Sequence, residues 1–313
     1  MARKTNGITH HQADNHYIGR FAPSPTGPLH LGSLYTALAS YLQARSRHGK
    51  WLLRIDDLDT PRNVPGASEA ILQTLTDFGL HWDDWVYYQS EQSEAYRAAL
   101  QELHSQNLVY ACICTRKTLR QSALEDPRHS NIYPGHCRGR QHSRNQPHAL
   151  RIETDLTPVA FSDQLQGDVE HILARQHGDF IIKRRDRIIA YQLAVVVDDH
   201  AQQVTEVVRG FDLLDSTPSQ IYLQRKLGFP VPRYMHVPIV TDSQGSKLSK
   251  QTHAEAVNTR NIGRTLHLLL TLLQQDPPRE LQNSPVEELL NWAVHNWRPE
   301  KLRNIAALGN GID

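Results

Sequence analysis

The amino-acid sequence predicts an α/β protein built on a parallel sheet, and its first 55 residues carry that prediction. An apolar start at residues 17–18 leads into a loop rich in proline and glycine, which opens a helical pattern of apolar side chains, Leu34, Leu38, Ala39 and Leu42. Gly49 ends this helix, and the apolar run at residues 51–55 is typical of a second buried strand. A strand, a helix and a second strand in this order form the unit that builds nucleotide-binding parallel sheets.

The loop before the predicted helix is a candidate phosphate site. A helix N-terminus offers backbone N–H groups and the positive end of the helix dipole, and both favour a phosphate group. Gly32 lets a ligand approach the backbone closely, while His30 and Ser33 add side-chain donors. Taken alone, His-x-Gly before a helix is a weak signal, and an ordinary proline-rich loop explains it equally well.

A second segment strengthens the phosphate interpretation. Residues 237–240 predict an apolar strand, and the glycine-containing loop after it carries Lys247 and Lys250. Lysines on a mobile loop can close over a triphosphate and neutralise the charge that develops as pyrophosphate leaves. A solvated surface loop also carries lysines, so the inference depends on the two segments together.

The cysteines form a candidate metal site. The chain has three, Cys112, Cys114 and Cys137, and an odd number without an export signal argues against a disulfide framework. Three thiolates in one stretch suit a structural zinc ion, which binds four nitrogen or sulfur ligands in a tetrahedron. Chemistry alone selects His136 or His129 as the fourth ligand, because imidazole is a far commoner zinc ligand than phenol. Three unrelated buried thiols are the alternative.

Composition indicates a soluble protein with a substantial core. The 313 residues, 39% of them hydrophobic, suffice for one large domain or two smaller ones. No apolar run approaches a membrane span, and we expect residues 1–16, which lack the apolar core of a signal peptide, to be a disordered leader. A net charge of +1 does not indicate nucleic-acid binding by the chain as a whole, so any such contact depends on local basic residues: Arg138, Arg140, Lys183, Arg184, Arg185 and Arg187.

Two motifs carry a resemblance to a known family. His30-Leu31-Gly32-Ser33 and Lys247-Leu248-Ser249-Lys250-Gln251 resemble the HIGH and KMSKS motifs of class I aminoacyl-tRNA synthetases. The stretch that begins at Arg20, Arg-Phe-Ala-Pro-Ser-Pro-Thr-Gly-x-Leu-His-Leu-Gly, is similar to the glutamyl branch, with further matches at residues 53–59, 189–199 and 207–214. Ser33 and Gln251 depart from the motif names, and Asp56 stands where many glutamyl enzymes carry Glu, but the helix start, both lysines and the acidic charge are retained.

The resemblance implies a Rossmann-like catalytic domain that is split by a zinc-containing insertion. Its first half is expected at residues 17–108, the insertion at 109–178, and the second half, with the KMSKS-like loop, at 179–257. Residues 258–313 predict a short helical tail, too small for the anticodon-binding domain of a full glutamyl-tRNA synthetase. The truncated relatives that resemble this chain are the glutamyl-queuosine tRNA(Asp) synthetases, which glutamylate queuosine in the anticodon loop of aspartate tRNA.

The resemblance also implies roles for single residues. Arg20 and Arg209 would anchor the glutamate side chain, because a bidentate arginine reads a carboxylate best, while the Tyr191 hydroxyl would be a hydrogen-bond partner and Asp56 would face the ammonium group. The same pocket would be lined by the segment after Arg20, namely Phe21, Ala22, Pro23 and Ser24.

Other implied roles concern ATP and the metal. His30, Lys247 and Lys250 would serve catalysis, and ATP would contact His30, Gly32, Ser33 and Lys250. In the relatives the pattern Cys-x-Cys followed by Tyr-x-x-x-Cys uses the tyrosine as a ligand, so the implied zinc ligands are Cys112, Cys114, Tyr133 and Cys137.

The expected activity is ATP-dependent activation of L-glutamate to glutamyl-adenylate and transfer to queuosine in aspartate tRNA. Catalysis would come from positioning and charge stabilisation, with Mg²⁺ accompanying ATP, rather than from a covalent protein nucleophile. We expect a cytoplasmic monomer without membrane contact. Two alternatives stay open: a shortened glutamyl-tRNA synthetase that charges the 3′ end of glutamate tRNA, and an adenylate-forming enzyme with a small-molecule acceptor.

Overall fold

The computed structural model describes residues 17–125, 132–142, 146–242, 257 and 259–309. The predicted leader, Lys247, Lys250 and His129 lie outside these residues.

The first parallel sheet has the order β1-β2-β3. Its strands are β1 (Ile18–Phe21), β2 (Lys50–Ile55) and β3 (Asp83–Tyr88), connected by the helices α1 (Leu31–Ser46) and α2 (Ala67–Asp77). Both strand pairs are parallel, with Ile18 opposite Lys50. The predicted strand, helix and strand unit is confirmed, and it starts a sheet of the α/β class.

A second sheet stands beside the first, in the order β7-β6-β10-β9. The strands β9 (Glu206–Gly210), β10 (Arg233–Val237) and β6 (Val159–Asp163) run parallel, and β7 (Gly167–His171) pairs antiparallel with β6. The backbone N–H of Thr205 donates to the carbonyl oxygen of Ile18 at 2.9 Å, so β9 and β1 start side by side. The carboxyl ends of the two central strands therefore meet at the same edge.

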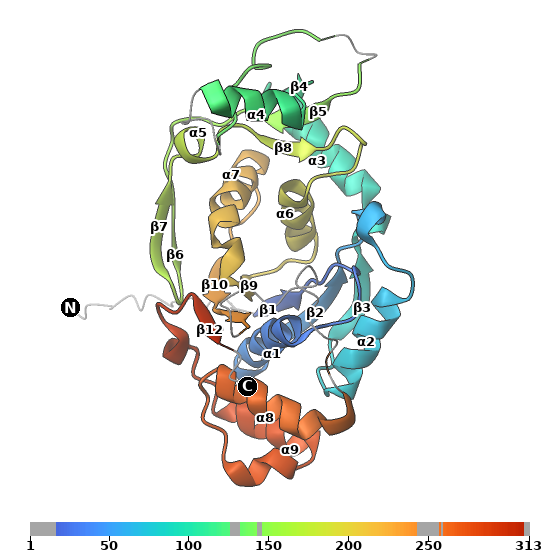
Figure 1. The fold of residues 1–313 in the computed structure, drawn as a ribbon, viewed down its shortest axis with the longest axis vertical. Helices are drawn as coiled ribbons and strands as arrows, with labels where there is room; N and C mark the ends of the chain where they lie inside the picture. The colour runs from blue at the N-terminus through green and yellow to red at the C-terminus, as the bar shows by residue number, and fades with distance from the viewer. Residues whose placement is uncertain (1–16, 126–131, 143–145, 243–256, 258, 310–313) are drawn as a thin grey trace, which may run out of the picture.

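The insertion contributes strands to two sheets. β4 (Val109–Cys112), β5 (Ala149–Ile152) and β8 (Phe180–Lys183) form an antiparallel sheet, whereas the hairpin of β6 and β7 joins the second parallel sheet. The antiparallel sheet and α4 (Arg116–Glu125) lie at one end of the molecule, with α3 (Ser93–Ser105) and α5 (Leu173–Gln176) nearby (Figure 1). β8 begins just after the predicted boundary at residue 178, and the domain boundaries stay predictions.

Helices cover both faces of the parallel strands. α6 (Tyr191–Ala201) and α7 (Thr217–Leu227) pack in one core with Val207 and Tyr234, and α1 packs in the other with Val208 and Met235. Successive residues of β9 and β10 thus point to opposite faces, as strand geometry requires. The edge where the carboxyl ends of β1 and β9 meet lies between these two helical layers.

The C-terminal part packs under α1, at the opposite end from the antiparallel sheet (Figure 1). It contains α8 (Ile262–Leu272), α9 (Val286–His295) and β12 (Ala307–Gly309), and β12 pairs with β11 (Ile239–Thr241). The indole N–H of Trp297 donates to Gln43 on α1 at 2.7 Å. The helical tail is therefore part of the same packed body as the sheet. Within the residues that the structure describes, no helix combines the length and the apolar character needed to cross a bilayer.

Candidate active site and metal centre

A cavity of about 650 Å³ opens where β1 and β9 end. Such an edge, at the carboxyl ends of parallel strands, is where α/β proteins bind ligands. Every predicted glutamate or ATP residue that the structure describes lines this cavity: Arg20, Phe21, Ala22, Pro23, Ser24, His30, Gly32, Ser33, Asp56, Tyr191 and Arg209. The fold thus brings together residues up to 189 positions apart, from Arg20 to Arg209, and their individual roles stay predictions.

The start of α1 is closed by a reciprocal pair of hydrogen bonds. The Ser33 N–H donates to His30 Nδ1 at 3.2 Å, and the His30 N–H donates to Ser33 Oγ at 2.8 Å. This arrangement is a capping box, with Ser33 as the residue that departs from the motif name. Because Nδ1 accepts a hydrogen bond, the neutral His30 ring carries its proton on Nε2, which gives the helix N-terminus a side-chain donor.

Arg209 at the end of β9 is buried among uncharged groups. Its guanidinium donates to His236 Nε2 at 3.0 Å, to Gln220 Oε1 at 2.8 Å and to Thr217 Oγ1 at 2.8 Å. Burial lowers the pKa of His236 and the nearby Arg209 lowers it further, although Asp163 opposes them, so the imidazole is neutral at pH 7. None of these three direct partners compensates the charge of the guanidinium.

Arg20 at the other side of the cavity has a charged partner. Its Nε and Nη2 donate to the two carboxylate oxygens of Asp199 at 3.1 and 3.4 Å. Arg54 donates to the same carboxylate at 2.7 Å and to Asp56 at 2.8 Å. The four side chains are buried, so they form a charge network in a medium where each unpaired charge is costly.

The acidic members of this network have opposite pKa shifts. Burial acts to raise the pKa of Asp199, but Arg20 and Arg54 outweigh it and hold that pKa below its usual value. Burial raises the pKa of neighbouring Asp198 to about 6, against the effect of Arg54. Asp198 accepts hydrogen bonds from Tyr96 at 2.8 Å and from Gln89 at 2.7 Å. Counting Asp56, the network has two arginines and three aspartates, so carboxylates are in excess.

Sequence reasoning assigned no role to Asp198, Asp199 or His236. Both aspartates belong to residues 189–199, one of the segments that carry the family resemblance. Two acidic residues directly after the apolar run at residues 195–197 were the pattern that could have identified them. His236 carried a similar signal, a polar residue between the apolar Met235 and Val237 in the buried part of β10. A polar residue in a buried strand or helix face needs a partner, which is a sign of a network.

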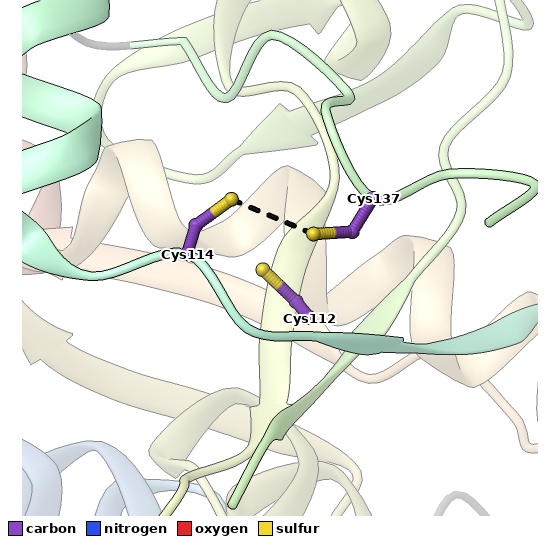
Figure 2. A group of neighbouring side chains, drawn as sticks. All are labelled: Cys112, Cys114 and Cys137. Carbon is purple, nitrogen blue, oxygen red and sulfur yellow. Dashed lines mark hydrogen bonds between the residues drawn. The ribbon is translucent and has the colours of Figure 1, made fainter. Parts of the chain in front are cut away.

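The three cysteine sulfurs lie within 4.8 Å of one another (Figure 2). Cys112 ends β4, Cys114 follows it, and Cys137 comes from the loop before β5. The sulfurs of Cys114 and Cys137 are 3.5 Å apart. Burial and the neighbouring sulfurs raise the pKa of Cys114 to about 11, whereas hydrogen bonds with Tyr133 and Arg151 outweigh burial and lower the pKa of Cys112, so repulsion opposes a second thiolate at Cys114. A metal ion among the sulfurs would remove this repulsion, which makes the cluster a candidate metal site.

The structure distinguishes the two described candidates for a fourth ligand. The Tyr133 hydroxyl lies 3.5 Å from the sulfur of Cys112 and 3.6 Å from that of Cys114. His136 instead has its Nε2 within 3.1 Å of Ser122 Oγ. The guanidinium of Arg151 lies 3.7 Å from the centre of the Tyr133 ring. Burial and the hydrogen bonds of the hydroxyl with Cys112 and Cys114 raise the pKa of Tyr133, so ionisation of this phenol would need a bound cation beside it.

Two of the predicted basic surface residues form ion pairs within the protein, and a third, Arg185, donates to the carbonyl oxygen of Ile113 at 2.6 Å. Arg138 forms ion pairs with Asp179 and Glu153, and Arg184 forms ion pairs with Asp59 and Asp186. Arg138 therefore forms its ion pairs around the insertion, whereas Arg184 connects the end of β8 to the segment after β2, and the charge of both is largely compensated.

The fold is that of a class I tRNA synthetase catalytic domain. A family model described as tRNA synthetases class I (E and Q), catalytic domain, matches residues 18–274. A protein of Ectopseudomonas mendocina named Glutamyl-Q tRNA(Asp) synthetase is 49% identical over 281 residues, which cover 90% of this chain and 93% of that protein. A protein of the same name from Thiobacillus denitrificans is 49% identical over 285 residues, 91% of this chain and 94% of the relative. The chain belongs to the glutamyl-Q tRNA(Asp) synthetase family of class I tRNA synthetases.

Solved structures agree on the fold. A glutamate tRNA ligase from Elizabethkingia meningosepticum, in complex with its amino acid, matches with a TM-score of 0.77 at 23% identity, covering 93% of this chain. This chain spans 66% of that ligase. The glutamate-tRNA synthetase of Elizabethkingia anophelis has the same TM-score at 24% identity.

Proposed function

We propose that this enzyme activates L-glutamate with ATP and transfers the glutamyl group to queuosine in the anticodon loop of aspartate tRNA. The observation that carries the proposal is that the predicted glutamate residues and the start of α1 line one cavity. The names of the relatives support the tRNA and the modified base as the acceptor. We place the enzyme in the cytoplasm as a monomer without membrane contact.

Glutamate fits the charges around the cavity. Its side-chain carboxylate would be bound by Arg209, which meets only uncharged side chains in its own hydrogen bonds, with the hydroxyl of Tyr191 nearby in the cavity wall. The ammonium group would be bound on the side where Asp56 and the other carboxylates exceed the arginines. The α-carboxylate then remains for ATP.

Activation is an in-line displacement at phosphorus. An oxygen of the α-carboxylate attacks the α-phosphorus of ATP, the bond to the bridging oxygen of the β-phosphate breaks, and pyrophosphate leaves. His30 Nε2 and the N-terminus of α1 would hold the phosphates. We propose that Lys247 and Lys250 stabilise the departing pyrophosphate, and that Mg²⁺ bound with ATP adds positive charge there. A hydroxyl of queuosine next attacks the acyl carbon, loses its proton and releases AMP.

We propose that Cys112, Cys114, Cys137 and Tyr133 bind one structural zinc ion. Zinc accepts thiolate ligands in a tetrahedron, and the Tyr133 oxygen is the fourth donor beside the sulfurs. Its contribution would be to fold the end of the insertion. Zinc content by mass spectrometry tests the ligand set: Tyr133→Phe and Cys137→Ser should lower it, whereas His136→Asn should retain it. Stoichiometric zinc in Cys137→Ser would exclude this ligand set.

The decisive experiment supplies labelled glutamate, ATP and Mg²⁺ to the enzyme with purified tRNA. Aspartate tRNA with queuosine, aspartate tRNA without it and glutamate tRNA are compared. Label on queuosine-containing aspartate tRNA alone is the expected result. Label on glutamate tRNA would make the protein a shortened synthetase, and AMP formation without label on any tRNA would indicate a small-molecule acceptor.

A further inference from the structure

A chain of three polar side chains links the hairpin of β6 and β7 to the cavity. Asp163 at the end of β6 lies with Oδ2 2.6 Å from His236 Nδ1, and the Nε2 of the same ring lies 3.0 Å from Arg209 Nε. All three residues are buried, and none is more than 4% exposed. The three residues come from three adjacent strands of one sheet, in the order β6-β10-β9.

The hydrogen-bond pattern fixes the proton on the imidazole. Arg209 Nε–H is a donor only, so His236 Nε2 must accept, and Nδ1 must then carry the proton that it donates to Asp163. Asp163 is itself held in place, because its Oδ1 accepts from the backbone N–H groups of Leu165 and Gln166 at 3.0 Å. The carboxylate thus selects the tautomer, and the tautomer supplies the acceptor for Arg209.

We propose that Asp163 and His236 are positioning residues that orient Arg209 toward a substrate carboxylate. The inference rests on the proposed function and deepens it, because it assigns part of the glutamate specificity to the hairpin of β6 and β7. The use of a neutral imidazole also has a chemical reason. A carboxylate in its place would neutralise Arg209, whereas His236 aligns the guanidinium and leaves its charge for the ligand.

Several charged or titratable groups face His236. Asp163 on β6 and Arg209 on β9 contact the ring, Asp212 after β9 acts on it through space, and Tyr234 on its own strand stacks at 6.1 Å. Protonation of Nε2 would remove the acceptor and place two cations side by side. The glutamate KM of the wild type should therefore rise as His236 becomes protonated on the acid side of neutrality.

Two substitutions of His236 test its hydrogen bonds with Asp163 and Arg209 separately. In His236→Asn the amide reaches the position of Nδ1 and can bond Asp163, but nothing replaces Nε2. In His236→Gln the longer amide brings an oxygen near the position of Nε2. Glutamate-dependent ATP–pyrophosphate exchange should show the glutamate KM of His236→Asn raised about tenfold or more, with a small change in kcat or the ATP KM. The glutamate KM of His236→Gln should stay within about threefold of the wild-type value at pH 7.5. Because a glutamine side chain does not ionise, this variant should also lack the KM increase that the wild type shows at low pH.

Asp163→Asn tests the tautomer. Because the backbone N–H groups need an acceptor, the amide oxygen should occupy the place of Oδ1, and the amide nitrogen should then donate to His236 Nδ1. The imidazole proton would move to Nε2, against Arg209. We expect a KM increase similar to that of His236→Asn, and little further increase when both substitutions are combined.

The outcomes separate this inference from the proposed function. Absence of glutamate-dependent exchange in the wild type would contradict the proposed function itself. A wild type that activates glutamate, with unchanged glutamate KM in folded His236→Asn and Asp163→Asn proteins, would overturn the positioning role alone. Equal losses in His236→Gln and His236→Asn at every pH would also contradict it, because the loss would then reflect packing.

Discussion

Arginines contact carboxylates on the β1–β2 side of the cavity, whereas on the β9 side Arg209 contacts uncharged side chains. Arg20 and Arg54 share Asp199, and three aspartates there face two arginines. Arg209 is held by His236, Gln220 and Thr217. We infer that the buried arginines serve two purposes: those on the first side stabilise the junction of the sheets, and Arg209 on the second side is proposed to bind a ligand.

The largest effect is expected on the β1–β2 side, and it concerns stability. Asp199→Ala removes the carboxylate that Arg20 and Arg54 share, which leaves buried positive charge without compensation. We expect the free energy of unfolding to fall by about 4 kcal/mol in urea denaturation. The exposed Asp168→Ala on β7 should change it by less than about 0.5 kcal/mol. A loss as small as that control would show that Asp199 is not needed to compensate the arginines.

The next effect is expected on the β9 side, and it concerns substrate binding. Arg209→Ala removes the cation that we assign to the side-chain carboxylate, so the glutamate KM should rise about 100-fold, equivalent to about 2.7 kcal/mol. The ATP KM should change little in the same exchange assay. Arg97→Ala, an exposed position on α3, is the matched control. An unchanged glutamate KM would remove Arg209 from the substrate site.

Asp198 on the β1–β2 side should make stability depend on pH. Its pKa of about 6 lies above the usual value of 3.8, so between pH 4 and 6 the folded state binds more protons than the unfolded state, and this group's stabilisation is lost as pH rises. Asp198→Asn cannot ionise and should gain stability relative to wild type by about 2 kcal/mol across that interval. Urea denaturation at pH 4, 5, 6 and 7 measures the difference. A difference that does not change with pH would contradict an excess of carboxylates on this side.

The smallest effect is expected at the start of α1, where neither side's charges are involved. Ser33→Ala removes one half of the capping box and should lower stability by about 1 kcal/mol. If the same geometry holds the phosphates, the ATP KM should rise about fivefold with the glutamate KM nearly unchanged. Ser46→Ala at the other end of α1 is the control. A Ser33→Ala protein with the ATP KM of this control would separate the capping box from ATP binding.

Local sequence patterns sufficed for much of the fold. The proline and glycine loop, the helix at Leu34 to Leu42 and the strand at residues 51–55 follow from periodicity and breakers, and the structure has β1, α1 and β2 there. The prediction of a single strand at residues 237–240 was wrong. Pro238 cannot donate to a ladder, so β10 ends at Val237 and β11 starts at Ile239.

The networks behind the site were not predictable in the same way. Asp163 and His236 are 73 positions apart, and only the parallel pairing of β6 with β10 brings them together. Asp199 on α6 and Arg20 on β1 are 179 positions apart, and only the packing of distant segments brings them together. Such pairings depend on tertiary packing, which a local pattern of residues does not encode.

Glutamate binding measured by calorimetry for Arg20→Gln and Arg209→Gln tests the contrast between the two sides most directly. Both substitutions remove one buried guanidinium, so their difference reports whether its charge was already compensated by the protein. We predict that Arg209→Gln weakens binding about 100-fold and Arg20→Gln by at most about tenfold. Equal losses, or a larger loss in Arg20→Gln, would contradict the assignment of the substrate carboxylate to the β9 side.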